Sequence, residues 1–137
     1  MVRDGLPVAF IDWDYAGPVG AIWDLAQTAW LNVQLHDDDV AELQGLSSLH
    51  DRARQLRLFV DAYGLPLTER DGLVARMAEY AIHSAREEAV EHGVNQTSGR
   101  AVDVTGYPVM WAIAWRARSA SWILRHHRVL EHYLTNS

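Results

Sequence analysis

The pattern of apolar and polar positions divides the chain into one short strand followed by helices. Residues 7–12 (PVAFID) form an apolar, β-prone run that is typical of a buried strand. Just before it, residues 3–6 (RDGL) carry the Asp-Gly pair of a hairpin turn, but only two residues precede that turn. We therefore expect the strand to lack a partner within the chain and to form a homodimer by pairing with a second copy.

Everything after residue 20 has helical spacing. Residues 22–35 repeat large apolar side chains every three or four positions, and the acidic run 37–39 follows as a break or an N-terminal cap. Ser47 or Ser48 is predicted to cap a helix that runs through Tyr63 and ends at Gly64. Thr68 is predicted to cap the next helix, which runs to about residue 92.

The last part of the chain consists of a loop and a strongly apolar helix. Residues 94–106 are polar and without periodicity, which is typical of a loop. The last helix is predicted to start near Pro108 and is apolar almost all round as far as Leu124, as in the central helix of a bundle. Residues 125–128 (RHHR) are predicted to form its solvated basic end. The expected fold is mainly α, a single helical domain over residues 1–137 with one short N-terminal β-strand or hairpin.

Composition narrows the classes of partner. At 137 residues and 49% hydrophobic, the chain can bury one sizeable core. Its formal net charge of −6 disfavours nucleic acid and favours a cationic small molecule. Arg116 and Arg118 interrupt the longest apolar stretch, so no membrane partner is expected. All 12 basic residues are arginine, which excludes lysine chemistry, and the lack of cysteine favours a cytoplasmic location.

Three aspartates stand out near the start of the chain. Residues 10–26 (FIDWDYAGPVGAIWDLA) bring an apolar run to a halt on Asp12 and Asp14, then place Asp24 beside Trp23. Carboxylates are rarely set against apolar neighbours without a partner or a metal. On residue type alone, Asp12 and Asp14 are also ordinary turn-forming residues at a strand end. Asp24 fits a helix N-terminus or a buried, hydrogen-bonded position.

Residues 11–18 (IDWDYAGP) and 23–26 (WDLA) resemble the aminoglycoside phosphotransferase and choline kinase-like family, which has a protein-kinase-like fold. The match covers residues 5–26, and the helices that follow look like the family's C-terminal lobe. The resemblance implies that Asp12, with Asp14 as a second ligand, binds Mg²⁺, which carries ATP in the intact enzyme. It also implies that Asp24 is a buried structural residue.

The resemblance implies an incomplete enzyme, because the catalytic loop and the lysine-bearing nucleotide lobe are absent from this chain. We therefore expect the Mg²⁺- and substrate-binding part of an ATP-dependent phosphotransferase acting on a small-molecule hydroxyl, with no catalytic residue of its own and inactive alone. One alternative is a non-catalytic helical dimerisation module derived from such a kinase. Another is a helical regulator unrelated to kinases, in which the motif arises by chance.

Two further groups of side chains allow more than one interpretation. His83 with Glu87 and Glu88 with His92 are i,i+4 pairs, which are more often solvated ion pairs than metal ligands. The helical spacing of the later tryptophans favours core packing over a cation–π cage. If the intact protein binds a cationic substrate, charge alone selects four candidate residues. These are Glu87, Glu88, Glu91 and Asp103.

Overall fold

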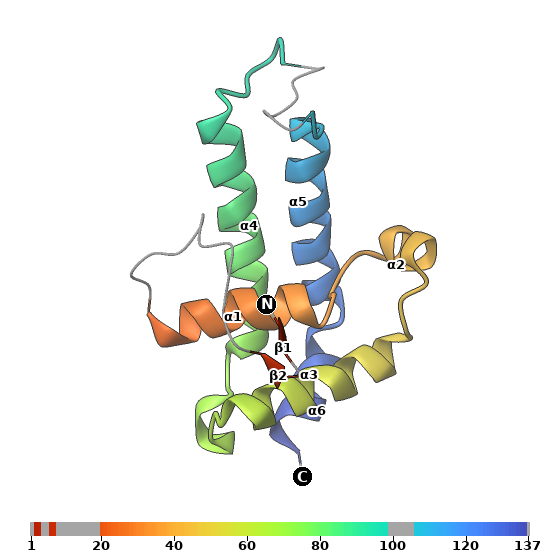
Figure 1. Cartoon of the computed structure of the whole chain (residues 1–137), viewed down its shortest axis with the longest axis vertical. Helices are drawn as coiled ribbons and strands as arrows, with labels where there is room; N and C mark the ends of the chain where they lie inside the picture. The colour runs from red at the N-terminus through yellow and green to blue at the C-terminus, as the bar shows by residue number, and fades with distance from the viewer. Residues whose placement is uncertain (1, 4–5, 8–19, 99–105, 137) are drawn as a thin grey trace.

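The computed structural model describes residues 2–3, 6–7, 20–98 and 106–136, and over these residues the fold is mainly α, as predicted (Figure 1). Its helices follow the hydrophobic periodicity closely, because each turns an apolar stripe toward a shared core. In chain order they are α1 (Ala21–Asn32), α2 (Asp38–Gln44), α3 (Leu49–Tyr63), the 3₁₀ turn η1 (Leu67–Glu69), α4 (Leu73–Glu91), α5 (Val109–Arg125) and α6 (His127–Thr135).

A short hairpin precedes the helices. Strand β1 (Val2–Arg3) pairs antiparallel with β2 (Leu6–Pro7), with Val2 opposite Pro7 and Arg3 opposite Leu6. The predicted hairpin is thus confirmed, whereas the expected lack of a partner within the chain is wrong for Pro7, the one residue of the predicted strand that the structure describes. Two residues before the turn suffice for a two-residue ladder. The rest of the predicted strand lies outside the described residues, and homodimerisation stays a prediction.

The helices form a long antiparallel pair crossed near its base. In Figure 1, α4 and α5 lie side by side, while α1 packs across α4 and α3 packs on α6. Fully buried side chains from these elements form one core that includes Trp30, Leu56, Met77, Trp122 and Leu134. This arrangement leaves a long, solvent-facing surface along α4 and α5.

The predicted role of the later tryptophans is only partly confirmed. Trp122 is fully buried and Trp115 packs against the core, but Trp111 is 38% exposed. The expectation of an α5 buried on all sides is also wrong, since Met110 and Leu124 face solvent as well. The physical reason is that α4 is the main neighbour of α5 and covers one side of it. None of the described helices is both long and apolar enough to span a bilayer.

Most helices begin and end at the residues that the local sequence predicts. Ser48 caps α3, its Oγ accepting from the backbone N–H of Asp51 at 3.2 Å, and Asp37 caps α2. Gly64, with φ of +88°, ends α3 in the left-handed conformation that favours glycine. The predicted Thr68 cap is wrong, because Thr68 lies inside η1 and α4 begins after Gly72, whose φ is +78°.

The basic segment after α5 is a break between two helices. Helix α5 ends at Arg125, and α6 begins at His127. His126 lies at the junction with its ring centroid 4.6 Å from that of Trp122. The predicted helix end is therefore confirmed for Arg125 only, because His127 and Arg128 belong to a short helix that was not predicted.

Candidate functional site

A concave surface lies between α1, α4 and α5, and we call it the α1–α4–α5 hollow. Its volume is about 520 Å³. Helix α1 supplies Trp23 and Trp30, α4 supplies Tyr80 and α5 supplies Trp115. This size lies within the range of sites that bind small ligands or side chains.

The aromatic rings of this hollow form one continuous series of contacts. Ring centroids are 5.0 Å apart between Trp23 and Tyr80, 6.3 Å between Tyr80 and Trp30, and 5.3 Å between Trp30 and Trp115. The seven-residue interval between Trp23 and Trp30 places both rings on the same face of α1. Docking of that face on α4 and α5 therefore builds an aromatic wall from three separate helices.

Carboxylates from α4 line the same hollow. The structure brings together Glu87, Glu88 and Glu91, three of the four predicted substrate residues. Glu88 is held at 3.2 Å by Arg116 Nη2 and at 3.5 Å by His92 Nε2. Glu87 has looser neighbours, and no ion-pair partner for Glu91 occurs in the part of the chain that the structure describes. Their role in binding a substrate stays a prediction.

The histidine–glutamate pairs on α4 have the geometry of ion pairs. His83 Nε2 lies 3.6 Å from Glu87 and His92 Nε2 lies 3.5 Å from Glu88. Among residues 20–98 and 106–136, no three or more His, Asp or Glu side chains gather in a way that would hold a metal ion. The ion-pair interpretation is therefore the one that the described geometry favours.

The predicted aspartates have different outcomes. Asp12, Asp14 and Asp103 lie outside the described residues, so the predicted Mg²⁺ ligands stay a prediction. Asp24 lies in the first turn of α1, as one interpretation required, but it is exposed, so its predicted burial is wrong. Burial raises the pKa of Tyr80, and the charges of Asp24 and Glu87 raise it further against the opposing effect of Arg116. The charge of Asp24 therefore affects Tyr80, one of the residues that line the hollow.

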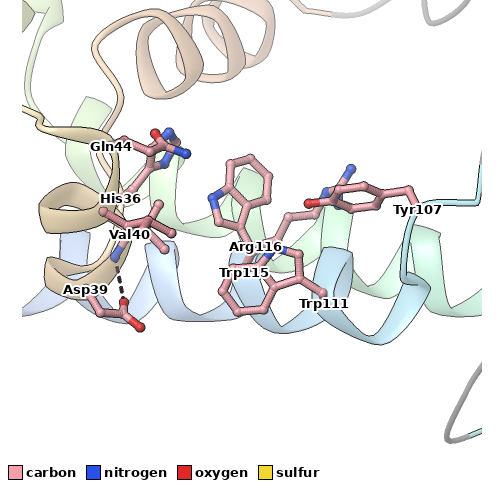
Figure 2. Close-up of a pocket in the computed structure, with 9 residues that line it drawn as sticks. His36, Asp39, Val40, Gln44, Tyr107, Trp111, Trp115 and Arg116 are labelled. Atoms are coloured by element: carbon pink, nitrogen blue, oxygen red, sulfur yellow. Dashed lines mark hydrogen bonds between the residues drawn. The ribbon is translucent and has the colours of Figure 1, made fainter.

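A second hollow of about 440 Å³ shares Trp115 and Arg116 with the first. Figure 2 shows Tyr107, Trp111, Trp115 and Arg116 along one side, with residues of α2 at its end. That end is formed by Asp39, Val40 and Gln44, with His36 just before them.

His36 is the most unusual side chain of this second hollow. It is 6% exposed, its ring centroid lies 5.1 Å from that of Trp115, and its Nδ1 has no hydrogen-bond partner. Burial, together with the positive charge of Arg52, lowers the pKa of His36 from 6.5 to about 4. His36 is therefore neutral at neutral pH. His36 was not predicted from the sequence, because no local pattern marks a histidine that becomes buried on folding.

Comparison with known proteins gives one informative relative. The trifolitoxin immunity protein of Rhizobium leguminosarum bv. trifolii is 50% identical over 129 residues, which cover 94% of this chain and 47% of that protein. The chain therefore spans about half the length of this curated relative. No family model matches the chain, and no solved structure matches it.

These comparisons correct the kinase interpretation. The assignment to the aminoglycoside phosphotransferase and choline kinase-like family is wrong, because the relative that matches nearly the whole chain is named an immunity protein. The predicted phosphotransferase function is wrong for the same reason. The alternative of a kinase-derived dimerisation module loses its support for the same reason. The motif match covered only residues 5–26, whereas the identity extends over 129 residues. Short motifs recur by chance far more often than identity of that length. No ATP or Mg²⁺ site is seen in the described residues.

Proposed function

We propose that this chain is part of an immunity protein that protects its cell from a toxin by binding it. The observation that carries the proposal is the 50% identity over 129 residues to the trifolitoxin immunity protein. Trifolitoxin is therefore the first toxin to test. Because the chain spans about half of that relative, the proposal concerns the full-length gene product that contains it.

The surface along α5 supports a binding mechanism. The two hollows share Trp115 and Arg116, so one ligand lying along α5 would contact both. Aromatic rings offer large contact areas with few rotatable bonds, and they dominate the binding energy of many interfaces. The carboxylates of α4 add a negative edge that would orient a ligand. Binding of this kind needs no chemical step.

Protection is the direct test. The full-length gene product is expressed in a trifolitoxin-sensitive strain, and the toxin dose that halves survival is measured against an empty vector. We expect this dose to rise. An unchanged dose at confirmed soluble expression would contradict the immunity function.

A matched pair of variants locates the surface. Tyr80→Leu removes a ring from the α1–α4–α5 hollow, whereas Tyr63→Leu removes an exposed ring at the end of α3. We expect Tyr80→Leu to lower the toxin dose that halves survival by about tenfold, because one aromatic contact of moderate strength is lost. Tyr63→Leu should leave this dose unchanged. Equal effects of the two variants would place the binding surface elsewhere.

Binding is measured separately from protection. Titration of the purified protein with trifolitoxin is followed by tryptophan fluorescence, which reports on Trp23, Trp30 and Trp115 around the hollow. Saturable quenching with a matching loss in Tyr80→Leu is expected. Protection without binding would leave the immunity function standing and contradict the binding mechanism.

A further inference from the structure

The second hollow, which we call the α2–α5 hollow, is lined mainly by aromatic and apolar side chains. Tyr107, Trp111 and Trp115 lie along one side of it, and α2 adds Val40 and Leu43 (Figure 2). Tyr107, Trp111 and Leu43 keep between 38% and 89% of their surface exposed. Apolar surface gathered around a hollow of about 440 Å³ favours a ligand or side chain that buries it.

Both charged side chains of this hollow already have partners. Asp39 forms an ion pair with Arg118. Arg116 Nη2 lies 3.2 Å from Glu88, while its Nε donates to a serine hydroxyl and its Nη1 to a backbone carbonyl. The lining therefore offers no unpaired charge among the described residues. A neutral ligand fits it better than an ion, because an ion would lose water without gaining a counter-ion.

His36 supplies one unsatisfied polar group at the end of the hollow. It is 6% exposed, and neither of its ring nitrogens has a hydrogen-bond partner among the described residues. Nδ1 is fully enclosed and cannot meet a ligand, whereas Nε2 is not enclosed in this way. The ring lies 5.1 Å from that of Trp115, and burial beside Arg52 keeps it neutral. Nε2 can therefore donate or accept one hydrogen bond, according to the tautomer.

We propose that the α2–α5 hollow binds a neutral aromatic ring that carries a hydroxyl group, as in the side chain of tyrosine. The ring packs against Trp111 and Trp115, and the hydroxyl forms a hydrogen bond with His36 Nε2. A phenol hydroxyl both donates and accepts, so it matches either tautomer of His36. This inference rests on the proposed function, since it names the chemistry of the toxin group that this hollow holds.

Two small probes that differ only in the hydroxyl group test the inference. Nα-acetyl-L-tyrosine amide and Nα-acetyl-L-phenylalanine amide have the same backbone groups and the same ring. Each is titrated into the full-length protein at neutral pH and followed by calorimetry. We expect saturable binding of both probes, about fivefold tighter for the tyrosine probe, which is the effect of one net hydrogen bond.

A matched pair of histidine variants tests the role of Nε2. His36→Phe keeps a planar ring and removes both nitrogens, so the two probes should bind equally to this variant. His50→Phe makes the same change at an exposed histidine of α3 outside this hollow, and it should keep the fivefold difference.

A third variant tests the aromatic wall with His36 intact. Trp111 is 38% exposed, so Trp111→Leu should leave the chain folded. It should weaken both probes alike by several-fold and keep the preference for the tyrosine probe, because the ring contact is lost and the hydrogen bond is kept. Thermal unfolding confirms that each variant is folded.

Three outcomes would overturn the inference. They are equal binding of the two probes to the wild type, no saturable binding of either, and an undiminished tyrosine preference in folded His36→Phe. The protection assay stays independent of these results. Protection with equal probe binding would reject the hydroxyl site and leave the immunity function standing. A tyrosine preference that His36→Phe removes, without protection, would support the site and reject the immunity function.

Discussion

His36 is neutral, buried and without a hydrogen bond to its Nδ1, and this combination sets a pH dependence of stability. Burial and the nearby Arg52 lower its pKa from 6.5 to about 4. Between these values the unfolded chain binds a proton that the folded chain does not. The free energy of unfolding therefore falls as pH is lowered through this window, by up to about 3 kcal/mol for a shift of this size.

The measurement is urea unfolding of the wild type and His36→Gln between pH 7 and pH 4.5. We expect the wild type to lose stability steeply over this range and the variant to lose less. His126, whose pKa is also lowered by burial, keeps some slope in both proteins. Parallel curves for the two proteins would show that His36 is protonated as easily in the folded chain as in the unfolded one.

Residue-scale features were predictable where a short segment determines them. Asp37 was expected to cap or break a helix, and its carboxylate accepts from the Asp38 N–H at 3.0 Å. Its further ion pairs, to Arg118 at 3.0 Å and Arg125 at 2.7 Å, join residues more than eighty positions away and have no local signature. Burial raises the pKa of Asp37, but the two ion pairs and the hydrogen bond of the cap lower it by more, so the pKa lies below its usual value. Thr68 does not cap α4, because this helix begins after Gly72, which has a left-handed backbone conformation and lies nearer to the apolar stripe of α4.

At the scale of elements, one arginine fastens the end of α6 to the rest of the chain. Arg70 is 4% exposed and donates to the Leu65 carbonyl at 2.7 Å and 2.9 Å and to the Leu134 carbonyl at 3.4 Å. It also lies 2.6 Å from Asp61, and together with Arg57 it holds the pKa of Asp61 below its usual value. Its planar fork serves three oxygens that a single ammonium could not reach together.

We predict that Arg70→Met lowers the free energy of unfolding by about 2–4 kcal/mol, because it leaves buried carbonyls unpaired while keeping the side-chain stem. Arg70→Lys should recover only part of this loss. Arg54→Met, which removes an exposed ion pair with Asp51, is the control and should change stability by less than about 1 kcal/mol. Urea unfolding measures all three, and hydrogen exchange in α6 locates the effect. Similar losses in Arg70→Met and Arg54→Met would show that Arg70 has no special role.

The hollow was only partly visible in the sequence, because it is made by the docking of three helices. Charge alone selected Glu87, Glu88 and Glu91, and all three line the hollow. Trp23 and Tyr80 were not grouped with them, since their 5.0 Å ring contact depends on how α1 crosses α4. Local periodicity gives the face of a helix, but the crossing that pairs two faces is settled by packing across the whole core.

At the scale of the molecule, the chain spans about half of its curated relative and yet builds one shared core. Side chains from α1, α3, α4, α5 and α6 meet in that core, with Trp30 from α1 and Trp122 from α5 fully buried in it. A core shared in this way couples the elements, because exposing one apolar face leaves its neighbours uncovered as well. Residues 1–137 expressed alone should therefore unfold as a single unit.

The measurement compares two probes of the same urea titration. Far-ultraviolet circular dichroism follows the helices, and tryptophan fluorescence follows Trp30 and Trp122 in the core. We predict one sigmoidal transition with coincident midpoints and slopes, the behaviour of a small two-state domain. Fluorescence change at lower urea than helix loss would mean that the packing around the core tryptophans, those of α1 included, loosens before the helices unfold. In that case the aromatic wall of the hollow, which α1 completes, would depend on the rest of the full-length protein for its stability.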